Sequence, residues 1–544
     1  MTPYPVYMNN KQIASRFDLL AKLLELHDDN PFKIRSYANA YLSLRKLEGD
    51  LTTMPKSELA EIKGVGTAIA DKIEELLLTG DMKTLKKYRD ITPEGVQQML
   101  AIKGLGPKKV KQIWKEMEIT SVGELLYACN ENRLVHYKGF GEKAQEEIKH
   151  RIEYFMDAQG KYLYAHVHRI AEELILMLQS AYSQNQFSLC GDVRRMMPEV
   201  GGIEVITDIS EQTFMPDILE KSDTDQWKFK DIPVFVYHVP AAGYHKSLFT
   251  RSCSETFLTA FTDENLNSGT EENIFKSRGL IFIPSECRER PEIIDTWKGE
   301  SDLIQTEDIQ GIIHNHSTYS DGLHTLADMS DYVKKCGYAY FVISDHSKSA
   351  GYAGGLQEER VLMQWAEIDA LNLAYKGDFQ VFKSIESDIL TDGSLDYHDD
   401  ILSRFDLVIA SVHSVLNMDE ARATSRLIKA IENPYTRILG HPTGRLLLAR
   451  RGYPLDHKKV IDACASNGVV MELNANPQRL DIDWTWIPYC MDKGVMIAIN
   501  PDAHSKESIH YIRYGTAAAR KGGLTKDMCL NTKSLSEFMI WLNR

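Results

Sequence analysis

The second half of the chain alternates short apolar runs with helical segments, and almost every apolar run ends in a histidine or an acid. The runs are YAYFVISDH (338–346), FQVFKSIESDI (379–389), DLVIASVH (406–413), RILGHP (437–442), GVVMELNA (468–475) and GVMIAINPDAH (494–504). Strand–helix alternation of this length is typical of a parallel α/β barrel. Active sites of such barrels gather at the carboxyl ends of the strands. The pattern therefore predicts a barrel with its chemistry on one rim.

Nine side chains in these runs or in the preceding segment GIIHNHSTYSDG (311–322) are candidate metal ligands. They are His314, His316, Asp321, His346, Glu386, His413, His441, Asp502 and His504. A single zinc site uses about four ligands, so nine converging side chains predict two or three divalent ions, with a carboxylate such as Glu386 bridging them. Mixed sites of imidazole and carboxylate accept Mn, Fe or Zn.

Clustered divalent ions favour phosphoester hydrolysis. They lower the pKa of a bridging water and stabilise the charge on the phosphate oxygens during in-line attack. Arg445 follows His441 closely, and we expect its guanidinium to contact a non-bridging oxygen as a catalytic group. The alternative for Arg445 is a salt bridge on the barrel rim. We expect His324 and His398 to be surface or supporting residues, because both lie off the ligand pattern.

A glycine pattern repeats in the first third of the chain. It reads IKGVGTAIADKI at 62–73, IKGLGPKKVKQI at 102–113 and, more weakly, YKGFGEKAQEEI at 137–148. Paired glycines let the backbone turn tightly, and the amides of the following helix attract anions. This is the layout of a helix-hairpin-helix, which holds the DNA backbone without reading bases. The expected contacts are Gly64, Gly66, Gly104, Gly106, Lys108 and Lys109.

The charge is unevenly distributed along the chain. Residues 1–150 hold 23 Lys and Arg against 21 Asp and Glu, a net charge of +2. Because the whole chain has a net charge of −14, residues 151–544 have a net charge of −16. The eight cysteines are scattered without a Cys-x-x-Cys pair, which favours reduced thiols in the cytoplasm. No apolar run approaches the roughly 18 residues of a membrane helix, and no secretion signal opens the sequence. We therefore expect a cytoplasmic protein without a membrane partner.

The N-terminal region resembles the lyase and fingers domains of family X DNA polymerases. The resemblance rests on NPFKIRSYANA (30–40) and GVGTAIADKIEELLLTG (64–80). It implies that Lys72 stands where lyase-active members carry the lysine that forms a Schiff base with an abasic sugar. Position 68, which is basic in some relatives, is Ala68 here. Lys72 is therefore a possible lyase nucleophile, and a simple phosphate contact is the alternative.

The segment LCGDVRRMMPEVGGIEVI (189–206) resembles the family X palm, where paired aspartates on a strand hold two magnesium ions. The corresponding positions are Gly202 and Glu204, and the third aspartate of the family corresponds to Phe235. In the thumb, Arg251 replaces a glycine of the family turn. The resemblance thus implies a degenerate polymerase site. Arg194 and Arg195 are either phosphate contacts or surface arginines on a scaffold.

The nine ligands resemble the PHP (polymerase and histidinol phosphatase) superfamily, and SDHSKS (344–349), GHPTGRLL (440–447) and NANPQRLD (474–481) resemble its version fused to bacterial family X polymerases. The resemblance implies a distorted (β/α)7 barrel and a manganese-dependent 3′–5′ exonuclease or 3′ phosphoesterase. The expected domains are a lyase-like helix-hairpin-helix domain (1–85), a fingers-like helix-hairpin-helix domain (86–150), a degenerate α+β nucleotidyltransferase-like palm (151–239), a thumb-like domain (240–290), a linker (291–310) and the PHP domain (311–544).

Several functions fit these features. The favoured one is a DNA end-processing nuclease acting on gapped or nicked DNA or on DNA with 3′ ends, whose former polymerase modules act as a clamp. A second is an active gap-filling polymerase with proofreading, against which the palm substitutions argue. A third is a small-molecule phosphatase of the histidinol-phosphatase type, for which the paired glycine hairpins have no use. A non-enzymatic scaffold would require lost metal ligands, and no ligand position is lost. Protein partners and oligomeric state are not predicted.

Overall fold

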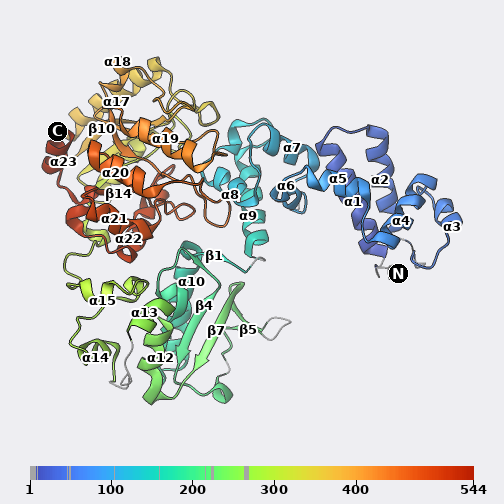
Figure 1. Cartoon of the computed structure of the whole chain (residues 1–544), viewed down its shortest axis with the longest axis horizontal. Coiled ribbons are helices and arrows are strands. Elements are labelled where there is room, and N and C mark those ends of the chain that lie inside the picture. The colour runs from blue at the N-terminus through green and yellow to red at the C-terminus, as the bar shows by residue number, and fades with distance from the viewer. Residues whose placement is uncertain are drawn as a thin grey trace. The chain divides into compact units, whose positions relative to one another are not determined.

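The computed structural model describes residues 8–543 apart from 9, 46, 48–50, 103, 158–159, 215, 222–225 and 262–268. The chain forms two compact units, which are described separately below (Figure 1). Unit 1 comprises residues 1–129 and 142–155, and unit 2 comprises residues 130–141 and 156–544. No helix among the described residues is long and apolar enough to cross a membrane.

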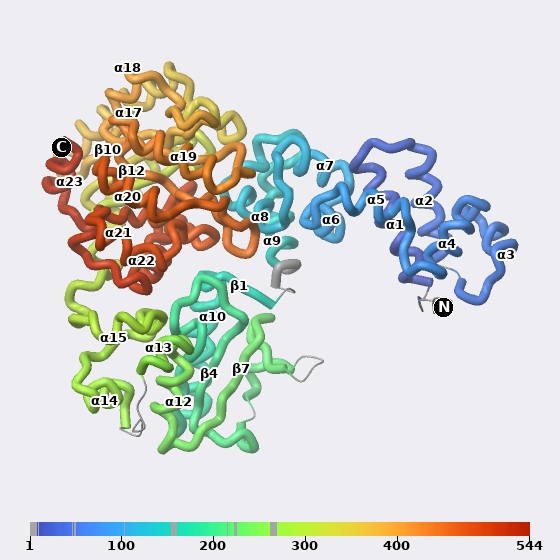
Figure 2. The backbone as a smooth tube through the Cα atoms, viewed as in Figure 1, coloured from blue at the N-terminus to red at the C-terminus, as the bar shows by residue number. Residues whose placement is uncertain are grey.

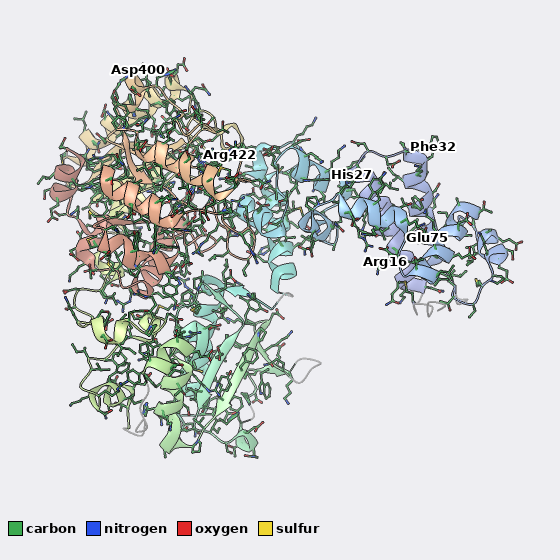
Figure 3. The ribbon with its side chains drawn as sticks, viewed as in Figure 1. Arg16, His27, Phe32, Glu75, Asp400 and Arg422 are labelled. Carbon is green, nitrogen blue, oxygen red and sulfur yellow. The ribbon has the colours of Figure 1, made fainter. Side chains whose placement is uncertain are left out.

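The described residues of unit 1 form helices and the turns between them. Its helices are α1 (Asn10–Leu26), α2 (Pro31–Leu44), α3 (Lys56–Glu61), α4 (Thr67–Thr79), α5 (Lys83–Asp90), α6 (Glu94–Met99), α7 (Pro107–Lys115), α8 (Val122–Asn130) and α9 (Glu142–Asp157). Helix α1 buries Phe17, Leu20 and Leu24 at helical spacing, because residues three and four apart share one face. His27, labelled in Figure 3, lies just after α1, with its Nε2 2.8 Å from the Thr92 hydroxyl.

The repeated glycines form the tight turns that the sequence predicts. Gly64 and Gly104 have φ angles of 88° and 89°, a left-handed conformation that side chains disfavour. The second glycine of each pair, Gly66 or Gly106, is the N-cap of the next helix, α4 or α7. A Cβ added at Gly66 or Gly106 would meet no atom within 4 Å. The backbone therefore stays open to a partner at both helix starts.

The first part of unit 2 is an α+β domain built on a five-stranded sheet. The strand order is β2 (Phe187–Leu189), β4 (Ile203–Thr207), β7 (Ile232–His238), β6 (Trp227–Phe229) and β5 (Glu220–Lys221). Strands β4 and β7 are parallel and the other neighbours are antiparallel. Helix α10 (Tyr164–Ala181) covers the sheet with Val167, Ala171, Leu174 and Leu178, which recur on one helical face. A two-stranded ladder of β1 (Tyr162–Leu163) and β3 (Glu199–Val200) and the short helix α11 (Gly191–Arg194) complete it.

A small helical part follows the sheet. It contains α12 (Tyr244–Arg251), α13 (Glu255–Ala260), α14 (Glu271–Lys276) and α15 (Ile293–Thr296). Phe249, Phe257, Phe261 and Phe275 form its aromatic core. Helix α15 lies in the predicted linker and packs Ile293 into this same core.

The rest of unit 2 is a parallel barrel of seven strands, as predicted. In sheet order they are β8 (Gly311–Ile312), β9 (Tyr340–Ile343), β10 (Gln380–Asp388), β11 (Leu407–Ser411), β12 (Thr436–Leu439), β13 (Val470–Asn474) and β14 (Ile497–Asn500). All neighbouring strands run parallel. A parallel bridge between Asn315 and Ala503 brings the ends of the first and last strands together, so the sheet nearly closes.

Helices surround the barrel, as the yellow-to-red tube of Figure 2 shows. They are α16 (Leu326–Lys335), α17 (Glu358–Tyr375), α18 (Asp399–Leu402), α19 (Glu420–Ile431), α20 (His457–Asn467), α21 (Ile487–Asp492), α22 (Ile512–Lys521) and α23 (Leu535–Leu542). Alternate strand residues face two different cores, because side chains alternate along a strand. Ile312 and Phe341 pack among the surrounding helices, whereas Val342 packs inside with Phe538 of α23. Phe538 also stacks on Tyr340 at the start of β9, so α23 fills the end of the barrel opposite the carboxyl ends of the strands.

Candidate metal centre

The nine predicted ligands all lie in or just after barrel strands. His314, His316 and Asp321 follow β8, and His346 follows β9. Glu386 lies within β10. His413 and His441 follow β11 and β12, and Asp502 and His504 follow β14. All nine are buried except His413, which is half-buried, and the parallel strands bring them to one rim.

The carboxylate of Glu386 is the hub of the cluster. Its Oε1 lies 2.9 Å from Nε2 of His441, 3.1 Å from Nε2 of His413 and 3.2 Å from Nε2 of His314. Its Oε2 lies 2.9 Å from Nδ1 of His346. One carboxylate that faces four imidazoles could hold a divalent ion together with them.

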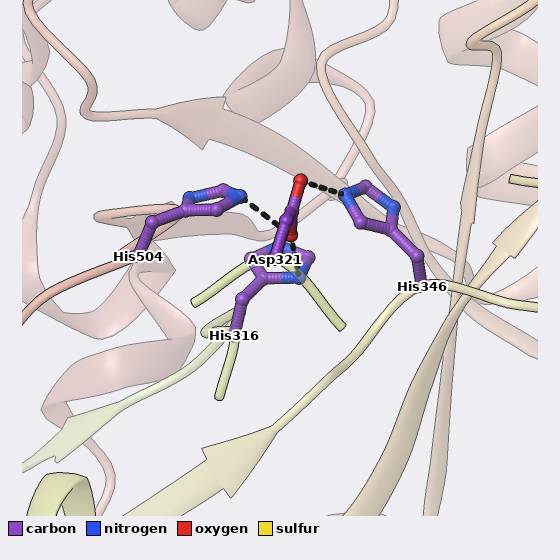
Figure 4. A group of neighbouring side chains, drawn as sticks. All are labelled: His316, Asp321, His346 and His504. Carbon is purple, nitrogen blue, oxygen red and sulfur yellow. Dashed lines mark ion pairs between the residues drawn. The ribbon is translucent and has the colours of Figure 1, made fainter. Parts of the chain in front are cut away.

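A second group gathers around Asp321 (Figure 4). Its Oδ1 lies 3.2 Å from Nε2 of His504 and 3.9 Å from Nδ1 of His316. Its Oδ2 lies 3.6 Å from Nε2 of His346. Asp502 completes the centre, with its Oδ1 3.1 Å from Nε2 of His316. His316 and His346 each face both carboxylate groups, so the ligand sets share members as they do in multinuclear sites.

The arrangement fits bound divalent ions. Nε2 of His314, Nδ1 of His346 and Nε2 of His504 are buried and make no hydrogen bond, although each lies within 3.2 Å of a carboxylate oxygen. Buried polar atoms are normally paired, so ligand atoms that lie close together without a hydrogen bond fit an ion held between them. Ligand atoms of His316, Asp321, His346 and His504 lie within 4.8 Å of one another. His314 and Asp502 also hold φ angles of 63° and 50°, and such strained residues concentrate at functional sites.

Electrostatics keep the centre suited to cations. Burial, together with His504 and His346, lowers the pKa of His316 to about 3, so this imidazole is neutral and free to coordinate. Burial disfavours the charged form of Glu386, but His413, His314 and His346 outweigh it and hold its pKa well below the ordinary value. Burial disfavours the imidazolium of His346, but Asp321 and Glu386 outweigh it and raise its pKa to about 10. The ionised carboxylates therefore attract positive charge, which bound divalent ions would supply in place of protons.

Three buried carboxylates that the sequence analysis missed support the ligands. Oε1 of Glu472 lies 2.6 Å from Nδ1 of His314, and Oδ1 of Asp388 lies 2.5 Å from Nδ1 of His413. Oε2 of Glu131 lies 2.5 Å from Nδ1 of His504. Such partners fix the ring orientation of a ligating histidine. Asp388 is the last residue of β10, so the strand-end rule contained a signal for it. Glu472 lies in the middle of β13, and no local pattern marks Glu472 or Glu131.

The arginine predicted to be catalytic holds a loop in place. Arg445 pairs through Nη1 with Asp483 at 2.5 Å, and its Nε donates to the carbonyl of Arg479 at 2.9 Å. Its Nη2 also donates to the carbonyl of Leu480. Nε of Arg479 lies 3.6 Å from Oδ2 of the ligand Asp502. A contact of Arg445 with phosphate stays a prediction, and Arg479 is an arginine that the structure places beside a ligand.

The three positions of the predicted degenerate palm come together. Glu204 on β4 pairs in register with Phe235 on β7, and a Cβ at Gly202 would lie 2.9 Å from the Phe235 ring. The Glu204 carboxylate accepts hydrogen bonds from the Tyr237 hydroxyl at 3.0 Å and the Asp192 amide at 3.2 Å. The Arg251 guanidinium lies 3.4 Å from the centre of the Tyr237 ring. The position thus holds one carboxylate, which is engaged by neutral donors.

Lys72 lies in unit 1, on α4, eight residues after Gly64. Its amine is 3.4 Å from the carboxylate of Glu75, which Figure 3 labels, and its side chain is 20% exposed. Burial opposes ionisation of Glu75, but the stronger backbone hydrogen bond from Lys83, together with Lys72, lowers the Glu75 pKa. Lys72 is therefore accessible and paired with an ionised acid.

Arg194 and Arg195 are both engaged in ion pairs. Arg194 pairs with Glu271 at 2.5 Å, and Arg195 pairs with Glu289 at 2.9 Å. Lys521 of α22 also pairs with Glu289 at 2.9 Å. These pairs link the palm-like sheet, the small helical part and the barrel within unit 2, so both arginines have a scaffold role.

Comparison with known proteins identifies the family. The chain is 31% identical to the DNA polymerase/3′-5′ exonuclease PolX of Bacillus subtilis (strain 168), over 99% of this chain and 100% of that protein. The chain belongs to the PolX family. This confirms the resemblance to bacterial family X polymerases with a PHP domain. Residues 8–82 match the helix-hairpin-helix domain, and residues 96–152 match the SAM-like helix-hairpin-helix tandem.

Relatives of the barrel also occur without the N-terminal parts. A probable phosphatase of Thermoanaerobacter sp. (strain X514) is 30% identical over 36% of this chain and 86% of its own length. A histidinol phosphate phosphatase from Lactococcus lactis, solved with zinc, L-histidinol and phosphate, covers 39% of this chain and 94% of its own at 16% identity and a TM-score of 0.30. In this chain, the helix-hairpin-helix matches occupy residues 8–82 and 96–152 and so precede the barrel in the sequence.

Proposed function

We propose that the barrel hydrolyses phosphoesters at DNA 3′ ends, as a 3′–5′ exonuclease or 3′ phosphoesterase, with two or three divalent ions, manganese first among them. The observation that carries the proposal is the Glu386 carboxylate, which faces four imidazoles beside the Asp321 group. The Bacillus subtilis relative matches 99% of this chain, and its name includes a 3′-5′ exonuclease, which supports the same activity.

In the mechanism, two groups of side chains would hold the ions. The first group is Glu386 with His314, His346, His413 and His441, and the second is Asp321 with His316, His504 and Asp502. Ions bound there supply an activated water and offset the charge on the phosphate. The supporting acids Glu472 and Asp388 hold the imidazoles in fixed orientations through their Nδ1 atoms. Arg479, whose backbone Arg445 holds, contributes positive charge where an anionic phosphate would bind.

The experiment is digestion of a 5′-labelled oligonucleotide after metal removal, with and without added Mn²⁺, alongside metal analysis of the purified protein. We expect stepwise shortening from the 3′ end that requires the ion. A small phosphomonoester such as histidinol phosphate serves as the competing substrate. Rapid hydrolysis of this monoester without shortening of the oligonucleotide would contradict the proposal and favour a small-molecule phosphatase.

We also propose that unit 1 binds gapped or nicked DNA or DNA with 3′ ends through its hairpins. The left-handed turns at Gly64 and Gly104 lead into helices whose first amides are unobstructed, and such helix starts attract phosphate. Lys108 and Lys109 lie in the first turn of α7, where their charge adds to this field. The matches to two helix-hairpin-helix families support this role.

The polymerase centre is inactive in this proposal. Two-metal nucleotidyl transfer requires carboxylates that converge on a pair of ions about 4 Å apart. Gly202 and Phe235 provide none, and Glu204 is held by Tyr237 and the Asp192 amide. The sheet therefore serves as a scaffold.

For Lys72 we propose attack on an abasic sugar, supported by its partial exposure on α4 after the Gly64 hairpin. Borohydride should trap a covalent complex between the protein and an incised abasic site. Lys72→Ala should abolish the complex, and Lys83→Ala is the matched control from the next helix. Equal trapping by Lys72→Ala would assign the reaction to another amine.

A further inference from the structure

Residues 130–141 lie outside the barrel in sequence but in the same compact unit as the barrel. They connect α8 to α9, the helices on either side of the third glycine pair, and they include a short 3-10 helix at Leu134–His136. Asn130 donates a hydrogen bond from its side chain to Gln478 at 2.6 Å, in the loop that follows β13. The segment is thereby anchored beside the metal centre.

Glu131 enters the centre itself. It is 2% exposed, and its Oε2 lies 2.5 Å from Nδ1 of His504, whose Nδ1 also lies 3.0 Å from the Asp502 carbonyl. Its Oε1 accepts a hydrogen bond from Asn476 at 3.3 Å. Nε2 of His504 points the other way, to Asp321 at 3.2 Å. The imidazole of His504 thus lies between the Glu131 carboxylate and the Asp321 ligand group.

Arg133 lies two residues further along the segment. Its Nε is 3.5 Å from Oδ2 of Asp321, and its guanidinium lies 4.9 Å from the centre of the Tyr352 ring. The side chain is 19% exposed, whereas the Asp321 side chain is fully buried. The Tyr352 hydroxyl is buried and makes no hydrogen bond, so it adds a polar atom beside the same group. A guanidinium on a partly exposed side chain, next to a candidate metal-ligand group, is suited to an anionic phosphate oxygen.

We infer that residues 130–141 form part of the metal centre: Glu131 is a positioning residue that orients His504, and Arg133 binds the phosphate of the substrate. This inference rests on the proposed phosphoesterase function. It implies that the PHP barrel of this chain is incomplete without the segment between α8 and α9. The barrel's active centre would then require a segment that lies, in the sequence, between two helices of unit 1. Stand-alone phosphatases related to the barrel would lack this coupling.

The test uses full-length variants and two independent readouts. The first is titration with Co²⁺, followed by its visible absorption, which measures ligand geometry and metal affinity without catalysis. Glu131→Gln should weaken Co²⁺ binding about 10–100-fold and change the spectrum, because partners of metal-bound histidines have effects of that size. His136→Ala, an exposed change in the same segment, should leave both unchanged. Should Glu131→Gln unfold by circular dichroism, Glu131→Asp, which keeps the charge, should bind Co²⁺ more weakly than the unaltered protein.

The second readout is hydrolysis of bis-p-nitrophenyl phosphate, which is too small to need the hairpins. Arg133→Ala should bind Co²⁺ normally but raise KM and lower kcat/KM at least about tenfold, and Arg133→Lys should restore part of this loss. Normal Co²⁺ binding by a folded Glu131→Gln or Glu131→Asp protein, or normal kinetics of Arg133→Ala, would overturn the corresponding assignment. Failure of the proposed function would look different. The unaltered protein would then bind Co²⁺ but hydrolyse neither bis-p-nitrophenyl phosphate nor the oligonucleotide.

Discussion

At the residue scale, a few buried carboxylates face cationic or ligating groups. Glu386 faces imidazoles, and Glu271 of the small helical part faces Arg194 and the fully buried Arg288. In both places an ionised acid is kept in the interior because its partners surround it. Removing the acid leaves those partners without compensation, which makes each a direct test.

Glu386→Gln should lose metal and activity together. The amide keeps the size of the side chain but removes the charge that separates neighbouring ions. Metal content should fall below that of the unaltered protein, and Mn²⁺-dependent hydrolysis should drop at least about 100-fold. Glu359→Gln, an exposed change on α17, is the control. Full metal content in a folded Glu386→Gln protein would contradict the bridging role.

Glu271→Gln should destabilise the small helical part in a pH-dependent way. Burial raises the pKa of Glu271, but Arg194 and Arg288 outweigh it and lower the pKa below the ordinary 4.5. The stabilisation is therefore present above that value and is lost as the pH falls through the lowered pKa. At neutral pH the change should cost about 3–5 kcal/mol, because Arg288 stays buried without its partner.

Thermal melting of the Glu271→Gln protein across the acidic range measures this effect. The difference in Tm from the unaltered protein should be largest at neutral pH and should shrink below pH 4.5. Glu272→Gln, an exposed neighbour, should change little at any pH. A difference for Glu271→Gln that is constant with pH would show that packing, and not the ion pair, is responsible.

At the scale of elements, turns and strand pairs decide what each module can do. The hairpin glycines were predictable because a left-handed turn before a helix requires glycine, and Gly64 and Gly104 have such φ angles. The palm resemblance implied that Glu204 and Phe235 share a site, and the register of β4 and β7 sets them opposite each other. The packing of α15 in the predicted linker could not be predicted, because Ile293 stands in a polar stretch with no periodicity.

The double change Gly66→Ala and Gly106→Ala should weaken DNA binding without loss of stability. Both positions have ordinary negative φ angles, and the added methyl groups meet no protein atom within 4 Å. They would instead obstruct a phosphate, so affinity for nicked DNA should fall about tenfold or more, as for two lost hydrogen bonds. Hydrolysis of bis-p-nitrophenyl phosphate should stay normal. Equal loss of both activities would mean that the hairpins support only the fold.

The palm should not extend a primer with nucleotides and Mg²⁺ or Mn²⁺. Restoring aspartates at 202, 204 and 235 should not rescue it, because a Cβ at Gly202 would lie 2.6 Å from the Pro233 carbonyl oxygen. Gel-based primer extension measures both proteins, with an active polymerase as the positive control. Robust extension by the unaltered chain would overturn the interpretation of this sheet as a scaffold.

For the whole molecule, the sequence predicted the barrel and its nine candidate ligands from one rule, the acids and histidines at strand ends. It did not predict that residues 130–141 belong with the barrel, because that contact joins Glu131 to His504 across more than two-thirds of the chain. Local periodicity carries no information about such a pair. For a similar reason the sequence prediction named Arg445 and not Arg479. Sequence position does not show which of the two arginines lies beside Asp502.

The central claim is that the chemistry of this chain takes place in the barrel's metal centre. Exonuclease assays of His316→Ala and His398→Ala on a 5′-labelled oligonucleotide with Mn²⁺ test it most directly. His316 is fully buried among Asp321, His346 and His504, whereas His398 is exposed at the start of α18. The 3′–5′ activity of His316→Ala should be at least about 100-fold lower than that of the unaltered protein, and the activity of His398→Ala should be unchanged. Undiminished shortening of the oligonucleotide by His316→Ala would contradict the claim.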